Sequence, residues 1–283
     1  MPKSDQNMNE IPKPEPRAVV VEFARPESSA AAREAISVRN LSKTYRGQEE
    51  VKALDGVSLA ISEREFVSIL GPSGCGKSTL LRMVAGLAPY DSGELMVNGR
   101  PVTKPSPEVG VVFQSHNMLP WLTVEQNMAL GAKLRKIPEA EYLPRVRSLI
   151  ATLCLGGFER SYPHQLSGGM RQRAAIGQIL ALEPAILLMD EPFGALDALT
   201  RDRLNVELLR VWQEKRQTAL FITHSIAEAV FLSDRVMVMS DRPGKIVHDI
   251  RIDLPRPRRP ETLKGAPRYG EYIAELSRLM GVF

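Results

Sequence analysis

The segment Gly71-Pro-Ser-Gly-Cys-Gly-Lys-Ser78 matches the pattern GxxxxGK[ST] of a phosphate-binding loop. An apolar run, Phe66–Leu70, precedes it, and a helix is predicted from Ser78 to Gly86. This order lets the glycine-rich backbone and the positive end of the helix surround an anion. The stretch therefore predicts an α/β fold that binds the phosphates of a nucleotide at the end of a strand.

The side chains of this loop have specific expected roles. Lys77 is expected to neutralise the β- and γ-phosphates and to stabilise the transferring group during catalysis. The Ser78 hydroxyl is expected to hold Mg²⁺. The residues assigned to nucleotide binding are Gly71, Pro72, Ser73, Gly74, Cys75, Gly76, Lys77, Ser78 and Thr79.

A second apolar run, Ile186–Met189, ends in the acidic pair Asp190-Glu191. A buried parallel strand delivers its last residues to the carboxyl edge of the sheet, where ligands of such folds bind. We expect Asp190 to orient Mg²⁺ or its bound water, and Glu191 to accept a proton from the water that attacks the γ-phosphate. Without the phosphate loop, an exposed acidic turn after a core strand would be the better interpretation.

Further strands are predicted from the alternation and the length of apolar runs. Alternating residues predict strands over 36–41 and 51–61. Asn98-Gly99 predicts a type I′ hairpin turn, because both positions tolerate a positive φ. Short apolar runs separated by helical segments indicate a mainly parallel sheet. These runs cover 109–113, 186–189, 219–223 and 235–239.

Helices are predicted by apolar residues at helical spacing and by capping residues. Leu204, Leu208, Val211 and Trp212 lie on one face of a predicted helix and are expected to pack in the core. Ser225 and Glu228 have the spacing of a capping box. The predicted helices cover 123–134, 139–155, 198–215, the stretch from 225 to 232, and 269–280.

These elements divide the chain into three expected parts. Residues 1–35 are expected to be a mostly disordered tail, because they are rich in proline and alanine. Residues 36–252 form the main domain, with a helical lobe at about 115–170. Residues 253–283 supply a basic linker and a C-terminal amphipathic helix. The prolines of the linker predict a stiff, extended segment whose arginines are solvated.

The composition restricts the class of protein. A length of 283 residues fits one large α/β domain, with or without an inserted lobe. The net charge of +4 is spread along the chain, so no nucleic-acid-binding stripe is expected. The two cysteines lack metal-ligand spacing and suit a reducing compartment. No apolar run has the length of a membrane span, and no export signal is present.

The pentapeptide Leu166-Ser-Gly-Gly-Met170 lies two dozen residues before the acidic pair. Two glycines behind a serine at a helix start expose backbone N–H groups and the positive end of the helix dipole. Ser167, Gly168 and Gly169 therefore predict a second anion site. A serine that only caps a helix explains part of the same pattern.

Together these motifs resemble the nucleotide-binding subunit of ATP-binding-cassette (ABC) transporters over about residues 36–252. The resemblance implies a P-loop NTPase core with a mainly parallel sheet, an antiparallel β-subdomain and an inserted α-helical subdomain. It also implies that Ser167, Gly168 and Gly169 address ATP held by a second copy. Two ATP molecules with Mg²⁺ would then lie in a head-to-tail homodimer, and hydrolysis would release it.

The resemblance assigns roles to four more residues. Tyr45 matches an aromatic residue that stacks on adenine, although a strand-edge tyrosine remains an alternative. Gln114 matches the glutamine that reaches Mg²⁺ and the attacking water, and His224 matches the histidine that contacts the γ-phosphate. Asp197, in Ala195-Leu-Asp197, matches the loop that crosses the dimer.

Two positions depart from the family pattern. Met170 replaces a common glutamine, which leaves the N–H donors unaffected. Gly177-Gln178 replaces the usual Ala-Arg pair and removes a cation near the site. We expect a change in nucleotide affinity or rate from the second departure.

Within the family, segments 118–127, 241–246 and 253–258 look like those of the nitrate, sulfonate and taurine importer ATPases. This likeness implies integral-membrane permease subunits as partners, indirectly a solute-binding protein, and a place at the cytoplasmic face of the membrane. Trp121 is a plausible anchor for a permease helix, with core packing as the alternative.

Two other functions compete with an importer ATPase. Soluble ABC proteins that act on DNA or ribosomes usually carry two cassettes or a long coiled coil, and the sequence has neither. A subunit that binds nucleotide only for assembly is disfavoured by Glu191 and His224.

Cysteine and histidine residues outside the motifs have modest expected roles. Cys75 lies among N–H donors beside Lys77, so we expect a lowered thiol pKa and inhibition of ATPase activity by alkylation. Cys154 is expected in the core. His116, His164 and His248 are expected at the surface or at helix caps.

Overall fold

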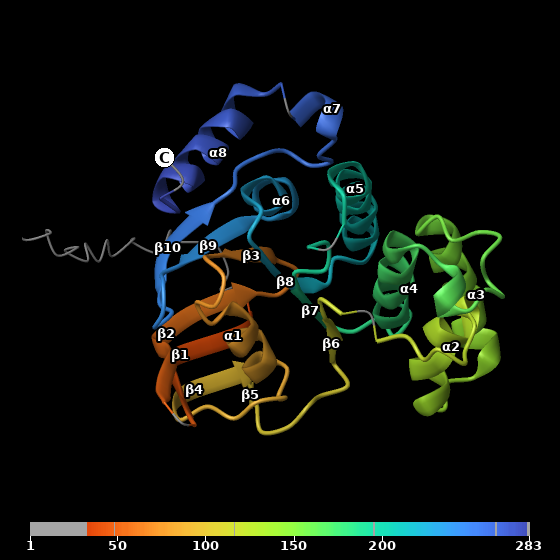
Figure 1. Ribbon diagram of the computed structural model, residues 1–283, viewed down its shortest axis with the longest axis horizontal. Coiled ribbons are helices and arrows are strands. Elements are labelled where there is room, and N and C mark those ends of the chain that lie inside the picture. Colours follow the sequence, from red (N-terminus) through yellow and green to blue (C-terminus); the bar gives the residue numbers. More distant parts are fainter. Residues whose placement is uncertain (1–32, 48, 116, 195, 264, 282–283) are drawn as a thin grey trace, which may run out of the picture. The chain divides into compact units, whose positions relative to one another are not determined.

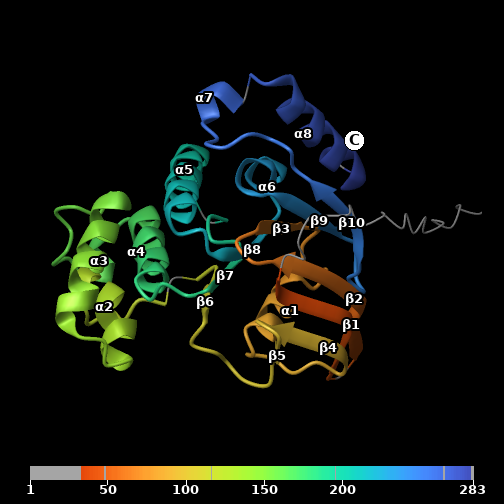
Figure 2. The ribbon, with the colours of Figure 1, turned by 180° about the vertical axis from the view of Figure 1, so that it is seen from behind.

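A six-stranded sheet carries the phosphate loop at the end of one strand (Figures 1 and 2). The structure is a computed structural model that describes residues 33–47, 49–115, 117–194, 196–263 and 265–281. The strand order is β10-β9-β3-β8-β7-β6, and all neighbours are parallel except β10, which is antiparallel to β9. The strands are β3 Phe66–Leu70, β6 Val109–Val112, β7 Ile186–Asp190, β8 Thr218–Thr223, β9 Arg235–Met239 and β10 Ile246–Arg251.

A second sheet is antiparallel and has the order β2-β1-β4-β5. The turn between β4 and β5 has φ of 49° at Asn98 and 73° at Gly99, which confirms the predicted type I′ turn. Helix α1 (Lys77–Val84) and the antiparallel strands share one apolar core with one face of the large sheet. The strands are β1 Glu34–Arg46, β2 Glu50–Ser62, β4 Ser92–Val97 and β5 Arg100–Pro101.

The other face of the large sheet is covered by helices α5 (Ala198–Lys215), α6 (Ile226–Leu232) and α8 (Pro267–Leu279) (Figure 1). Their core contains the expected apolar face of α5, including Trp212, whose ring lies 5.4 Å from that of Phe66 in an edge-on contact. Strands β3, β7 and β8 are buried at every position because both faces of the sheet are covered.

Three helices form a lobe beside the sheet: α2 (Val124–Leu134), α3 (Glu139–Thr152) and α4 (Gly168–Leu180) (Figures 1 and 2). A short 3-10 helix, η1 (Pro163–Gln165), precedes α4. The lobe core includes Ala174 and Ala181, so the expected boundary near residue 170 falls inside α4. The predicted fold class is confirmed, with a parallel core, an antiparallel sheet and an inserted helical lobe.

One departure from the family pattern has a packing explanation in this lobe. A Cβ atom at Gly177 would lie 2.5 Å from Met128 Cε, so the thioether of α2 fills the space beside the glycine of α4. Gly131 of α2 receives Leu182 in the same way, at 2.8 Å. Helix α2 therefore packs closely against α4 at Gly177 and against the turn that follows α4 at Gly131.

The expected boundary between the N-terminal tail and the main domain needs one correction. Strand β1 begins at Glu34, and Ala35 is buried, so the last two residues of the predicted tail belong to the sheet. Residues 1–32 of that tail lie outside the described residues. A short helix, α7 (Pro260–Leu263), was not predicted. Within the described ranges, no helix has both the length and the apolar character needed to cross a membrane.

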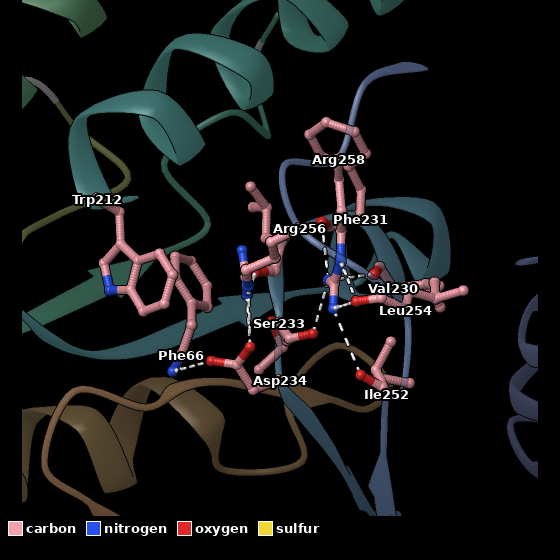
Figure 3. A network of polar contacts seen from close by, with 12 residues as sticks. Phe66, Trp212, Val230, Phe231, Ser233, Asp234, Ile252, Leu254, Arg256 and Arg258 are labelled. Atoms are coloured by element: carbon pink, nitrogen blue, oxygen red, sulfur yellow. Dashed lines mark hydrogen bonds and ion pairs between the residues drawn. The ribbon is translucent and has the colours of Figure 1, made fainter. Parts of the chain in front are cut away.

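The prediction of solvated arginines in the basic linker holds for Arg259, which is exposed, but is wrong for Arg256 and Arg258, which are drawn in Figure 3. Arg258 is only 4% exposed, and its guanidinium group donates hydrogen bonds to five backbone carbonyl groups. Three of them end helix α6, where carbonyl groups lack helical partners and the helix dipole is negative. Burial lowers the pKa of Arg258 to about 10. The acceptors are the carbonyl oxygens of Val230, Phe231, Ser233, Ile252 and Leu254.

Arg256 also makes contacts within the folded domain. Its Nη2 donates to the carbonyl oxygen of Leu232 at 2.8 Å and to Asp234 Oδ1 at 2.7 Å. Its guanidinium group lies 4.5 Å from the centre of the Trp212 ring. Both side chains are labelled in Figure 3. The linker therefore joins the C-terminal ends of α5 and α6.

Candidate nucleotide site

The phosphate loop depends on glycines that allow a tight approach to β2. Gly76 caps helix α1 with φ of 111°, in the left-handed region. A Cβ atom there would lie 2.7 Å from Leu54 Cδ2 and 2.8 Å from the Ala53 carbonyl oxygen. The backbone can therefore take this path only with glycine at position 76.

Lys77 lies at the first position of α1 and is 4% exposed. Its ammonium group donates to the carbonyl oxygens of Gly71 at 2.7 Å and Pro72 at 2.8 Å. These contacts hold the positive charge against the loop, where phosphates of a nucleotide would lie.

Strands β3 and β7 bring Ser78 and Asp190 together across 112 positions of sequence. Ser78 Oγ donates to Asp190 Oδ1 at 2.9 Å. Burial raises the pKa of Asp190, while the hydrogen bond from Ser78 opposes that shift. A hydroxyl and a carboxylate suit Mg²⁺, which binds few protein oxygens and completes its shell with phosphates and water. Within the described ranges no cluster of three His, Cys, Asp or Glu residues could hold a metal alone.

Glu191 and His224 meet at the carboxyl edge of the sheet. Glu191 Oε2 lies 3.0 Å from His224 Nδ1. The backbone of Glu191 has φ of 43°, an uncommon value for a residue with a side chain, and its N–H donates to the Ile222 carbonyl oxygen at 2.9 Å. Such strained positions are often found at functional sites.

One open groove brings half of the predicted site residues together. A Cβ atom at Gly194 would lie 3.4 Å from Glu191 Oε2 and 3.7 Å from Gln114 Nε2, so both side chains approach the same point. Tyr45 is 44% exposed near the end of β1, and its hydroxyl lies 3.5 Å from Thr79 Oγ1. The groove is lined by Tyr45, Val51, Ala53, Ser73, Gly74, Gly76, Lys77, Ser78, Thr79, Gln114, Glu191 and Arg242.

The four residues predicted to address a second ATP molecule do not line this groove. Ser167 caps α4 by accepting from the Met170 N–H at 3.3 Å, and Gly168 has no described atom within 4 Å of a Cβ placed there. Asp197 caps α5 by accepting from the Thr200 N–H at 3.0 Å, which lowers the pKa of Asp197. Both helix starts are exposed and remain available to another molecule. These four residues are Ser167, Gly168, Gly169 and Asp197. Five other predicted residues are also absent from the groove lining: Gly71, Pro72, Cys75, Asp190 and His224.

Arg242 is a groove residue that the motifs did not identify. Its Nε donates to the Gly74 carbonyl oxygen at 3.3 Å, and it lies in an exposed loop between β9 and β10. The loop is pinned to the phosphate loop, because a Cβ atom at Gly244 would lie 2.2 Å from the Cys75 carbonyl oxygen. From the sequence, segment 241–246 indicates only a likeness to one group of importers. An arginine beside a rigid Pro-Gly pair is the sequence signal that could identify this residue.

The expected lowered pKa of Cys75 and the expected core position of Cys154 are both wrong. Inhibition of ATPase activity by alkylation of Cys75 stays a prediction. Cys75 is 2% exposed, and burial raises its pKa more than the neighbouring Lys77 lowers it. The Lys77 ammonium nitrogen is 3.9 Å from Cys75 Sγ and is engaged by carbonyl groups. Cys154 is exposed, with φ of 52°, because the chain turns there after α3.

Three other predictions are resolved by burial. The core alternative for Trp121 is wrong, since the residue is 68% exposed. Only half of the predicted capping box forms: Ser225 Oγ accepts from the Glu228 N–H, whereas the Glu228 carboxylate is buried and accepts from Thr223 Oγ1. His164 is exposed and stacks on Tyr162, and His116 lies outside the described residues.

Comparison with known proteins identifies relatives of this chain. Residues 54–194 match the family model described as ABC transporter. An uncharacterised ABC transporter ATP-binding protein of Methanocaldococcus jannaschii is 49% identical over 79% of this chain and 84% of its own length. An aliphatic sulfonates import ATP-binding protein of Bacillus cereus is 44% identical over 79% of this chain and 88% of its own length.

Two solved structures have a fold similar to that of this chain. The dimeric structure of a bacterial ABC transporter cassette gives a TM-score of 0.69 at 33% identity, covering 77% of this chain and 99% of that one. A post-hydrolysis state of the same cassette bound to ADP and Pi gives 0.68 at 31% identity, with the same coverage.

Proposed function

This chain belongs to the family of ABC transporter ATP-binding proteins, and from that premise we propose that it hydrolyses ATP to drive an importer. The observation that carries the proposal is the convergence of Lys77, Ser78, Asp190, Glu191 and His224 on one sheet edge. These groups come from three separate segments, and each has a role in phosphoryl transfer to water.

The geometry supports a division of work among these residues. Lys77 neutralises phosphate charge, and Glu191 accepts the proton of the attacking water. His224 holds the Glu191 carboxylate through the 3.0 Å contact and reaches the γ-phosphate region. Ser78 and Asp190, with Gln114 at the groove edge, would hold Mg²⁺. The ion would neutralise charge on the β- and γ-phosphates.

A second copy of the chain is proposed to complete each site. Ser167, Gly168, Gly169 and Asp197 present helix starts outside the groove, where they would address ATP on the facing cassette. The dimeric state of a structural relative supports this arrangement. The result is a homodimer with ATP between the subunits.

The permease is proposed to bind the loop that carries Trp121. This loop is rigid because buried Asn127 accepts from the Leu119 N–H at 2.7 Å and donates to three carbonyl groups of the loop. An exposed indole on a fixed loop is suited to anchoring a partner helix at the cytoplasmic face of a membrane. A solute-binding protein would then act indirectly.

The solute is proposed to be nitrate, a sulfonate, taurine or a similar small molecule. Support comes from likeness in segments 118–127 and 241–246 and from the aliphatic sulfonate importers among the relatives. None of the cassette residues described above selects a solute.

ATP turnover by the purified chain tests the enzymatic proposal, with Mg²⁺ present and with Mg²⁺ removed by chelation. The expected result is phosphate release that requires Mg²⁺, and nucleotide binding without turnover would contradict it. Affinity capture from membranes separates an importer subunit from a soluble ABC protein. Enrichment of ribosomes or DNA in place of a membrane permease would favour the alternative.

A further inference from the structure

Helices α5 and α6 begin at the two loops that carry Asp197 and His224. Asp197 caps α5, and Ser225, the residue after His224, caps α6. The helices pack against each other over the large sheet (Figure 2). A displacement of either helix start would therefore move a residue of the proposed site.

A partly buried ion pair links these two helix starts. Arg201, one turn into α5, donates from Nη2 to the Leu196 carbonyl oxygen at 2.8 Å. Its Nε lies 3.6 Å from Glu228 Oε1 in α6. The side chains are 26% and 7% exposed, respectively, so water screens this pair only weakly.

Glu228 continues the connection to the His224 loop. Its second carboxylate oxygen accepts from Thr223 Oγ1. The same hydroxyl oxygen accepts from the Ser225 N–H at 3.0 Å. Thr223 and Ser225 flank His224, so one carboxylate fixes the backbone on both sides of the residue that contacts Glu191.

The Arg201 and Glu228 side chains do not form a direct hydrogen bond. The separation of 3.6 Å exceeds the usual hydrogen-bond range of about 2.7 to 3.2 Å, and Arg201 Nε has no hydrogen-bond partner among the residues described. A cavity of about 140 Å³ lies beside Arg201 and Glu228 and extends to α7 and α8. The two side chains therefore have room to approach when either loop moves.

The opposite ends of α5 and α6 are fixed. Arg256 stacks on Trp212 of α5 and binds the Leu232 carbonyl oxygen at the end of α6, while Arg258 binds the carbonyl groups around it (Figure 3). These contacts restrain the C-terminal ends of the two helices. Motion is therefore concentrated at the N-terminal ends, which follow the Asp197 and His224 loops.

We propose that Arg201 and Glu228 are positioning residues that couple the Leu196-Asp197 loop to His224. When a second copy displaces Asp197, the Arg201 guanidinium carries that displacement to Glu228, and Glu228 sets the position of His224 against Glu191. The inference depends on the proposed function, because it needs Asp197 at a dimer contact and His224 in ATP hydrolysis.

Steady-state kinetics of the full-length chain test this coupling. Glu228→Gln is expected to lower kcat about tenfold or more, because small misplacements of a catalytic group are costly, while KM for MgATP stays within about twofold. Arg201→Lys is expected to recover part of the kcat lost in Arg201→Gln. The double variant Arg201→Gln/Glu228→Gln is expected to be no slower than the slower single variant, since both changes break one connection.

A matched control is the partly buried pair Arg235–Glu65, whose atoms lie 3.0 Å apart away from both loops. Glu65→Gln is expected to lower the melting temperature without changing kcat per folded molecule. If Glu228→Gln gives the same result, the pair is only structural and the proposal is overturned.

A second variant covers the case in which Glu228→Gln does not fold. Thr223→Val keeps the ion pair but removes the hydroxyl that links it to the His224 loop, and it is expected to lower kcat with KM retained. An unchanged kcat would overturn the proposal. Wild-type activity separates the two hypotheses: a wild-type chain without turnover overturns the proposed function and the coupling together, whereas active wild type with active variants overturns only the coupling.

Discussion

His224 Nδ1 lies 3.0 Å from Glu191 Oε2, so the residue that follows strand β8 contacts the side chain of the residue that follows strand β7. The two strands that deliver them, β7 and β8, are neighbours in the parallel sheet. This contact orients the carboxylate toward the groove in which the phosphate loop lies. The proposed catalytic pair is therefore assembled by the register of the sheet.

Replacement of the carboxylate tests its role as a base. Glu191→Gln should retain MgATP binding and lower kcat about a hundredfold or more, because an amide cannot accept the proton. Gel filtration should show a dimer trapped in ATP and Mg²⁺. The measurement is phosphate release together with equilibrium binding of a fluorescent ATP analogue. Turnover near the wild-type level would require another base.

Arg242 is predicted to contribute to nucleotide affinity. Arg242→Ala should raise KM for MgATP about threefold to tenfold with little change in kcat, because a cation at the groove edge is lost but the reacting groups are kept. Lys245→Ala is the control in the same loop, since Lys245 pairs with Asp55 at 2.7 Å and does not line the groove. Equal effects of the two substitutions would show that only the loop, and not the arginine, matters.

Gly244 is predicted to be essential for the position of the phosphate loop. Gly244→Ala places a methyl group 2.2 Å from the Cys75 carbonyl oxygen, so the backbone must shift. The expected result is a loss of about 1 to 3 kcal/mol in stability and weaker ATP binding. Gly270→Ala in α8 is the control, because no atom lies within 4 Å of the added Cβ. That helix should gain about 1 kcal/mol, and thermal unfolding measures both.

Trp121 is predicted to anchor the permease. Trp121→Ala should leave the ATPase activity of the isolated chain unchanged and weaken capture of the permease about thirtyfold, as loss of a central aromatic anchor does. Phe158→Ala, which removes another exposed aromatic ring of the same lobe, is the control. Full retention of the permease by Trp121→Ala would place the contact elsewhere.

The reactivity of Cys75 is predicted to be low at neutral pH. Burial raises its thiol pKa, so little thiolate is present near pH 7 and the fraction grows as the pH rises toward the raised value. Iodoacetamide should therefore label exposed Cys154 first, and mass spectrometry of peptides measures the order. Faster labelling of Cys75 than of Cys154 in the absence of ATP would contradict this.

Local sequence determined the elements that carry the chemistry. The phosphate loop, the strand that ends in Asp190-Glu191 and the turn at Asn98-Gly99 all follow from backbone requirements within a few residues. Glycine permits left-handed backbone, and a continuous apolar run requires burial on both faces. Such patterns are readable because the residues that impose them are neighbours in the chain.

Only the tertiary structure decided where individual polar and reactive side chains lie. Arg258 is buried because the end of α6 supplies free carbonyl groups, and Cys75 is buried because Gly244 allows another loop to pack against it. Arg201 and Glu228 meet because α5 and α6 pack side by side. These contacts join segments that are distant in sequence. The burial, ion pairs and pKa values of these side chains therefore depend on how the segments pack together, which no local sequence pattern encodes.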